Sequence, residues 1–126
     1  MEVNSIGIGN DIGKKGEKLA KEYLEQNNYK ILTTNFYCRQ GEIDIIAKKE
    51  DTVIFVEVKT RSNNAYGKPA EAITKKKKIR MLKAINYYLY KYDVREYVRI
   101  DAIEVSFKEN KWNINHIKNA IWEDEI

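Results

Sequence analysis

Residues 41–61, which read GEIDIIAKKEDTVIFVEVKTR, constrain the fold of this chain more than any other stretch. Two runs rich in Ile, Val and Phe flank the polar tetrad KEDT, a pattern typical of two antiparallel strands joined by a short turn. A turn centred on this tetrad places Asp44 opposite Glu57, and the same register places Glu42 opposite Lys59. The sequence therefore predicts a β-hairpin that brings acids from two strands together.

Alternation along the two strands sorts the side chains of this hairpin onto two faces. One face is wholly apolar, and we expect it to be core. The other face gathers acids and a lysine beside two apolar side chains. The apolar face comprises Ile43, Ile45, Ala47, Ile54, Val56 and Val58, and the mixed face comprises Glu42, Asp44, Val53, Phe55, Glu57 and Lys59.

The mixed face is hard to explain by folding alone. Like charges directly opposite each other on a sheet destabilise it by about 0.2–1 kcal/mol, so a cation is expected between Asp44 and Glu57. Opposed side chains have Cβ atoms about 4.5–5.5 Å apart, which lets two carboxylates ligate one hard divalent ion through oxygen. Lys59, two residues beyond Glu57 on the same face, could reach the same spot. Glu42 is a further acid on this face that could instead pair with Lys59 or Arg61.

A bland alternative is a solvated lattice of salt bridges, worth about 0–1 kcal/mol for each exposed pair. Spacing alone favours that alternative. Glu57 argues against it, because it interrupts the apolar run VIFVEV. A carboxylate buried there without a partner would cost several kcal/mol unless a metal ion or another cation compensates it.

Composition bounds the class of protein. The chain has 126 residues, of which 43% are hydrophobic and 33% charged, so we expect one soluble globular domain over residues 1–126, with residues 1–10 as a loose arm. Lys and Arg outnumber Asp and Glu by 23 to 19, which permits a polyanionic partner without requiring one.

A single cysteine, Cys38, excludes an internal disulfide and fits a reducing compartment. No apolar run reaches a membrane span of about 20 residues and the opening lacks a secretory signal, so the expected location is cytoplasmic.

The remaining periodicities predict an α+β chain in the order helix, three strands, helix, two strands. The first helix is expected to be amphipathic, with Glu17 at the edge of its apolar stripe, where it either faces the sheet or is exposed. The predicted ranges are helices at about 11–27 and from about Pro69 to Tyr92 with a break near Thr74, strands at 29–34, 97–107 and 112–117 besides the hairpin, and a polar connection at 35–40.

Other polar and aromatic residues have competing interpretations. The basic run at the start of the second helix, Lys75–Lys78, fits a solvated helix face and a nucleic-acid surface about equally well. His116 has no second His or Cys to form a metal site with, and we expect it to be structural. Asp101 is expected to brace a basic residue. The nine tyrosines, especially Tyr87, Tyr88, Tyr90 and Tyr92, are expected to pack rather than stack on bases.

Several motifs together carry a family resemblance. Asp44, twelve intervening residues and then Glu57-Val58-Lys59 resemble the D…(D/E)xK signature of restriction-endonuclease-like nucleases. The whole set resembles the YraN family of predicted endonucleases over nearly the entire chain, although Tyr37 stands where an arginine is expected. The set comprises Gly16-Glu17, Tyr29–Leu32 leading to Asn35, GEIDIIA, FVEVKTR, Tyr66-Gly67, Thr74 with Lys77, Arg99–Asp101 and His116–Ala120.

This resemblance implies a restriction-endonuclease-like α+β fold, with a central mixed sheet flanked by helices. The family is similar, at a distance, to archaeal Holliday junction resolvases, which implies a metal-dependent phosphodiesterase acting on DNA, including branched or structured DNA. Asp44 and Glu57 would then hold Mg²⁺ or Mn²⁺. The backbone carbonyl of Val58 would be a further ligand, Lys59 would position or deprotonate the attacking water, and Glu17 would complete the coordination shell.

The residues expected to contact nucleic acid are Arg39, Arg61, Lys75, Lys77, Lys78 and Arg80. Two other functions stay open. One is a non-catalytic nucleic-acid-binding protein that keeps the fold with a vestigial site. The other is a protein-interaction role for the tyrosine-rich helix, which includes formation of a homodimer, since a two-fold symmetric pair would help to resolve a junction.

Overall fold

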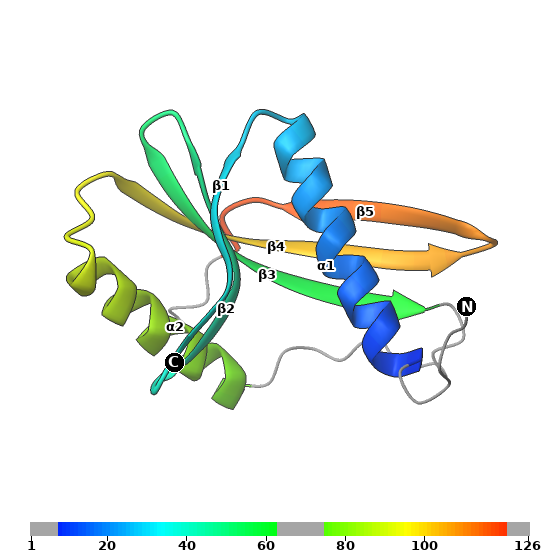
Figure 1. Ribbon diagram of the computed structural model, residues 1–126, viewed down its shortest axis with the longest axis horizontal. Coiled ribbons are helices and arrows are strands. Elements are labelled where there is room, and N and C mark those ends of the chain that lie inside the picture. The colour runs from blue at the N-terminus through cyan, green and yellow to red at the C-terminus, as the bar shows by residue number, and fades with distance from the viewer. Residues whose placement is uncertain (1–7, 63–74, 121–126) are drawn as a thin grey trace.

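The computed structural model describes residues 8–62 and 75–120, and the structural statements below concern these residues. Their order of helices and strands is the expected α+β order, which is therefore confirmed (Figure 1). Neither described helix has a stretch long and apolar enough to cross a membrane. The elements are α1 (Ile8–Gln26), β1 (Lys30–Cys38), β2 (Gly41–Lys49), β3 (Thr52–Ser62), α2 (Lys75–Lys91), β4 (Tyr97–Lys108) and β5 (Lys111–Ile117).

The five strands form one sheet in the order β1-β2-β3-β4-β5. β1, β2 and β3 are antiparallel neighbours, β3 and β4 are parallel, and β4 and β5 are antiparallel. A parallel pair needs a crossover connection, and α2 lies in the segment that connects β3 to β4. The expected mixed sheet is thus confirmed.

The predicted register of the central hairpin is confirmed wherever β2 and β3 pair. Ile45 lies opposite Val56, and the ladder runs from this pair to the turn. It stops there, so Asp44 and Glu57 occupy the first position past its end, and the expected pairing of residues 42 and 59 does not form. Beyond this point β2 pairs with β1 alone, and both strands bend away from β3 (Figure 1).

An unusual backbone conformation in β1 accompanies the bend. Asn35 has a left-handed backbone, with φ of 51°. It lies between the paired positions Thr34–Ile45 and Phe36–Ile43, at the level of Asp44. A left-handed residue departs from the extended backbone of a strand, and it coincides here with the point where β2 leaves β3.

Two separate cores cover the two faces of the sheet. α1 contributes Ala20 and Leu24 to one core, and α2 contributes Met81, Ala84 and Ile85 to the other. The expectation of a single core face is therefore wrong, because the mixed face packs against α2 through two apolar side chains. Ile43 also belongs to the α2 core, since the bend in β2 separates it from Ile45. The first core contains Ile45, Ala47, Ile54 and Val56 of the hairpin, and the second contains Ile43, Ile46, Val53 and Phe55.

Some boundaries differ from those expected. α1 begins at Ile8, so residues 8–10 are helical and do not belong to a loose arm. β1 continues to Cys38, so residues 35–38 are strand where a polar connection was expected. The reason is the packing of Phe36 against α2, where its ring centroid lies 5.3 Å from that of Tyr88. The expectations for residues 1–7, the loop at 63–69, the helix start at Pro69, the break at Thr74 and the tail from residue 121 lie outside the described residues.

Candidate functional site

Asp44 lies where β2 separates from β3. Its carboxylate accepts a hydrogen bond of 2.8 Å from the backbone N–H of Val58 in β3. This bond takes the place of the next ladder bond between the two strands. The N–H and C=O groups of one strand residue point toward the same neighbour, so the carbonyl of Val58 also faces the gap that holds Asp44.

Glu57 is the second acid of this gap and is 4% exposed. Its Oε2 atom lies 3.3 Å from Nζ of Lys77, in the first turn of α2. Gly41 allows α2 to come this close, because a Cβ atom at Gly41 would lie 2.6 Å from the carbonyl oxygen of Arg80. The resulting cavity of about 130 Å³ is called the acid pocket below, and it is lined by Glu42, Asp44, Glu57, Lys77, Arg80 and Met81.

Burial and mutual repulsion govern the charges of the acid pocket. The pKa of Asp44 is raised to about 7, chiefly by burial and also by the carboxylates of Glu57 and Glu17, against the lowering effects of the Val58 N–H and Lys77. Burial also raises the pKa of Glu57, while Lys77 lowers it. Two ionised acids here therefore need more positive charge than one lysine supplies.

Glu17 approaches the acid pocket from α1. The residue before it, Gly16, is buried, and a Cβ atom there would overlap the side chain of Thr60 in β3. This close approach places Glu17 near enough to raise the pKa of Asp44. Across residues 8–62 and 75–120, however, no three His, Cys, Asp or Glu side chains are arranged to share an ion. The nearby acids do not form a closed coordination shell in this arrangement.

Lys59 and Arg61 both face an acid that the sequence did not single out. Oε2 of Glu104 lies 4.0 Å from Nζ of Lys59 and 3.6 Å from Nη2 of Arg61. Lys59 also lowers the pKa of Glu57, so its ammonium group lies within the field of both acids. The parallel register of β3 and β4 places Glu104 beside Lys59. No local pattern reveals this neighbour, since it depends on the strand order.

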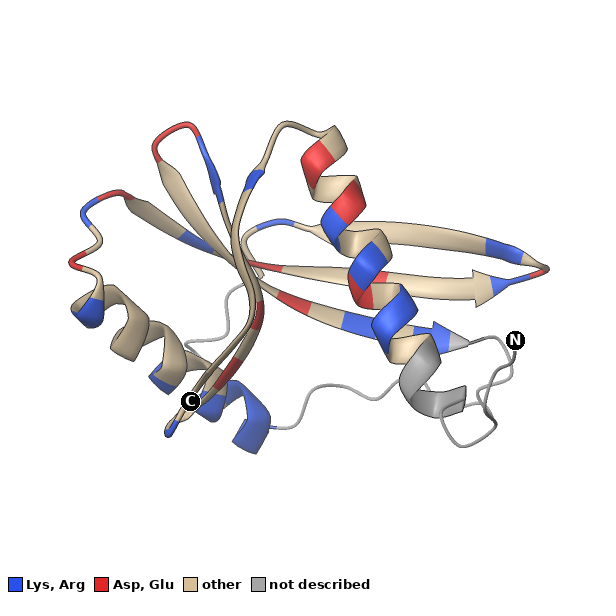
Figure 2. Ribbon diagram, in the orientation of Figure 1, with Lys and Arg blue, Asp and Glu red and all other residues tan. Residues whose placement is uncertain are grey.

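The other expected nucleic-acid contacts lie around the acid pocket. Lys75, Lys77, Lys78 and Arg80 come from the first two turns of α2, and all but the half-buried Lys78 are exposed. Arg39 is exposed in the turn between β1 and β2. Figure 2 shows this basic end of α2 beside the acidic part of β2. The sequence did not indicate that Lys77 would contact Glu57, because nothing local fixes how α2 docks.

Asp101 forms a second buried charge cluster, on the α1 side of the sheet. It is fully buried and accepts hydrogen bonds of 2.9 Å from both Nε and Nη2 of Arg99, and another of 2.9 Å from the backbone N–H of Asn119. Nε2 of His116 lies 2.7 Å away, and the other nitrogen of that ring contacts the hydroxyl of Tyr23. The expectation that Asp101 braces a basic residue is confirmed, and His116 belongs to the same cluster.

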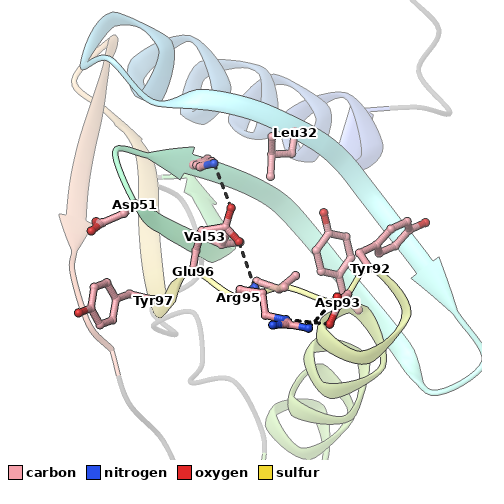
Figure 3. Close-up of a pocket in the computed structure, with 11 residues that line it drawn as sticks. Leu32, Asp51, Val53, Tyr92, Asp93, Arg95, Glu96 and Tyr97 are labelled. Carbon is pink, nitrogen blue, oxygen red and sulfur yellow. Dashed lines mark hydrogen bonds and ion pairs between the residues drawn. The ribbon is translucent and has the colours of Figure 1, made fainter.

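A larger cavity than the acid pocket lies at the other end of α2 (Figure 3). It measures about 810 Å³, and its lysine and its arginine are each paired with an acid that also lines it. Lys48 lies 3.0 Å from Glu96, and Arg95 lies 3.0 Å from Asp93. None of the expected catalytic, metal or nucleic-acid residues lines this cavity, so its size does not make it the better candidate site.

The fold and the acid pocket together define an α+β protein with one buried and one half-buried carboxylate at the point where a hairpin separates from a mixed sheet. Residues 16–105 match the model of a family described as Uncharacterised protein family UPF0102, and the chain belongs to this family. The expected YraN membership is thereby confirmed.

Similar proteins carry the same family name. A UPF0102 protein of Clostridium beijerinckii is 47% identical over 116 residues, which cover 90% of this chain and 94% of the relative. A UPF0102 protein of Alkaliphilus oremlandii is 46% identical over 86% of this chain and 96% of the relative. One from Geobacter metallireducens is also 46% identical, over 86% and 90% respectively. These names report no activity.

Proposed function

We propose that the protein is a divalent-metal-dependent endonuclease-like phosphodiesterase that acts on DNA, including branched or structured DNA. The observation that carries this proposal is the pair of acids formed by the half-buried Asp44 and the buried Glu57, in a gap that the backbone of Val58 also faces. Acids with raised pKa values in a cavity are typical of functional sites rather than of surface salt bridges.

The oxygen donors of the acid pocket suit Mg²⁺ or Mn²⁺. Hard divalent ions prefer carboxylate and carbonyl oxygens, and Asp44, Glu57 and the carbonyl of Val58 provide this chemistry. The pKa values of both acids stay raised despite the cations Lys77 and Lys59, and a divalent ion would favour their ionised forms. When bound, such an ion supplies polarisation of the scissile phosphate and a lower pKa for bound water.

Other side chains of the protein would contribute to the remaining steps of the proposed hydrolysis. Lys59, in the field of Glu57, would position or deprotonate the attacking water. Glu17 would complete the coordination shell from α1. Lys77 offsets the charge of Glu57, and its ammonium group would contact a phosphate if Glu57 bound an ion. Further cations would hold the DNA backbone, and these are Arg39, Arg61, Lys75, Lys78 and Arg80.

A cleavage assay tests this proposal. Labelled duplex, single-stranded and four-way junction DNA are incubated with the parent protein and with Asp44→Asn, in Mg²⁺ or Mn²⁺. We expect metal-dependent products from the parent and none from the variant. Asp51→Asn is the matched control, because Asp51 is exposed at the hairpin turn away from the acid pocket. Equal products from the parent and Asp44→Asn would contradict the proposal.

A non-catalytic nucleic-acid-binding protein is the second candidate, and one observation favours it. Glu57 is already paired with Lys77, and among the described residues no three potential ligands are arranged to share an ion. On this alternative, the parent and Asp44→Asn bind DNA equally and neither yields products in any metal. The same assay, run beside a gel-shift measurement, therefore separates the two candidates.

We also propose that the protein binds branched DNA as a homodimer. A four-way junction presents two equivalent cleavage points, which a two-fold pair would match with two acid pockets. Light scattering on the protein with and without a junction measures its mass. A monomer in both states would contradict the dimer and leave the proposed chemistry unaffected.

A further inference from the structure

A second cavity lies beside the acid pocket, along the outer edge of β1. It measures about 340 Å³, within the range of roughly 300–1,000 Å³ that is usual for ligand sites. The end of β1 and its turn form one side, and two residues of α2 form the other. We call it the edge pocket, and it is lined by Phe36, Tyr37, Cys38, Arg39, Gln40, Tyr87 and Lys91.

The charge of the edge pocket favours an anionic ligand. Its two charged lining residues, Arg39 and Lys91, are both cations. The larger cavity at the end of α2 differs, because its lysine and arginine each have an acid partner within that cavity. In the edge pocket Lys91 instead lies over aromatic rings, with Nζ 5.7 Å from the centroid of Tyr87. Its positive charge is thus available to a phosphate.

The edge pocket also presents aromatic surface. Tyr37 is 74% exposed, although it lies in a strand whose neighbour Phe36 packs against α2. The rings of Phe36 and Tyr87 lie 6.3 Å apart between centroids on the inner side of the same cavity. Exposed aromatic rings interleaved with cations are the combination that binds single-stranded nucleic acids, in which bases stack on rings while phosphates contact the cations.

Two structural relationships place the edge pocket near the acid pocket. Tyr37 of the edge pocket pairs across the strands with Glu42 of the acid pocket. In α2, Arg80 lines one cavity and Tyr87 the other, seven residues further on, which is about 10 Å along the helix axis. A stacked strand advances about 3.4 Å per nucleotide, so about three nucleotides span this distance.

We propose that the edge pocket binds an unpaired base of a nucleic-acid strand, stacked on Tyr37, with the flanking phosphates on Arg39 and Lys91. This inference rests on the proposed function, because it assumes that the strand passes the acid pocket. It narrows the substrate to DNA with unpaired nucleotides close to the cleavage point. A fully paired duplex keeps its bases inside the helix, where Tyr37 does not reach them.

The test compares binding to a single-stranded oligonucleotide and to a blunt duplex of the same sequence, by fluorescence anisotropy with EDTA present so that no strand is cut. Tyr37→Ala should weaken single-strand binding about tenfold, the scale of one base-stacking contact, and change duplex binding less than about twofold. Tyr37→Phe keeps the ring and should bind like the parent. Tyr90→Ala is the matched control, because Tyr90 is 87% exposed and lines neither pocket.

A second measurement identifies which base of the oligonucleotide stacks on Tyr37. An oligonucleotide with 2-aminopurine at successive positions should lose fluorescence on binding at one position, and Tyr37→Ala should abolish this quenching. Equal losses of affinity in Tyr37→Ala and Tyr90→Ala, or on single strand and duplex, would overturn the inference. So would the absence of any nucleic-acid binding. DNA cleavage by the parent, without a loss of single-strand binding in Tyr37→Ala, would refute this inference alone. A loss of single-strand binding in Tyr37→Ala, without DNA cleavage by the parent, would refute the proposed hydrolysis alone.

Discussion

Val58 donates its backbone N–H to the carboxylate of Asp44 over 2.8 Å, just beyond the last paired residues of β2 and β3, Ile45 and Val56. The strand separation and the candidate site are therefore one structural feature. If the ladder continued, the backbone N–H and C=O groups of Val58 would form hydrogen bonds with β2. Because the ladder stops, the side chain of Asp44 enters the sheet beside Glu57. Five tests follow from this arrangement and its surroundings.

The first test concerns the raised pKa of Asp44. Its value moves from 3.8 to about 7, chiefly by burial, so the folded protein holds this proton where the unfolded chain has lost it. The stability of the metal-free protein should fall as the pH rises from 3.8 to about 7 and then level off. We expect Asp44→Asn to raise the free energy of unfolding at about pH 8 by about 1–3 kcal/mol, measured by urea titration in EDTA. Asp51→Asn should change it by less than about 0.5 kcal/mol, and a loss of stability in Asp44→Asn would refute the prediction.

The second test concerns metal. Mg²⁺ or Mn²⁺ at 100 times its dissociation constant should stabilise the parent by about 2.7 kcal/mol, seen as a higher melting temperature. Binding requires ionised Asp44, so below about pH 7 the affinity in calorimetry should fall up to tenfold for each pH unit. Asp44→Asn should lose the melting shift. An equal shift in that variant would place the ion elsewhere.

The third test concerns the ion pair between Lys77 and Glu57. Lys77→Met leaves the buried carboxylate without this cation, and we expect a loss of about 1 kcal/mol at neutral pH without metal. This is less than the 3–5 kcal/mol typical of fully buried pairs, because water screens the exposed lysine. Added Mn²⁺ should restore most of the loss. Lys76→Met, which changes an exposed neighbour in the same turn, is the control. Equal losses in both variants would exclude a specific role for Lys77.

The fourth test concerns Asp101. Burial alone would raise the pKa of this acid, but hydrogen bonds from His116, Arg99 and the N–H of Asn119 lower it to about 2. The corresponding stability, about 2 kcal/mol, should be complete above about pH 4 and should be lost as the pH falls toward 2. Asp101→Asn should remove this acid-dependent loss and destabilise the protein by about 3 kcal/mol at neutral pH. The exposed Asp93 provides a control, since Asp93→Asn should leave both measurements nearly unchanged.

The fifth test concerns the docking of α2. A methyl group at Gly41 would meet the carbonyl oxygen of Arg80, so Gly41→Ala should push α2 away from β2 and cost about 1–3 kcal/mol. Gly13→Ala offers the contrast, because no atom lies within 4 Å of a Cβ there and alanine favours a helix. We expect that variant to be neutral or more stable. Thermal unfolding measures both, and equal effects would show that the close approach at Gly41 is unimportant.

Local periodicity was sufficient for much of the fold. The alternation of apolar residues on both sides of the KEDT turn predicted the hairpin register that pairs Ile45 with Val56. It could not predict the bend in β2, because the left-handed backbone of Asn35 lies on another strand. The same bend assigns Ile43 to the α2 core, whereas strict alternation groups it with Ile45.

The candidate site divides in the same way. Asp44 and Glu57 could be paired from the sequence, because they belong to one hairpin. The contacts of Lys77 with Glu57 and of Glu104 with Lys59 could not, since each joins segments that only the docking of α2 or the pairing of β4 brings together. Strand order and helix docking depend on long-range packing, which no local spacing records.

The parallel pairing of β3 with β4 also orders the events of folding. Thr52 pairs with Tyr97, far along the chain, whereas the β2–β3 hairpin closes through a tight turn. Local contacts form faster than distant ones, so the hairpin should assemble first and bring its two acids together while α2 and β4 are still undocked. Acid repulsion would then slow this early step, and mildly acidic refolding buffer should speed the collapse of the chain.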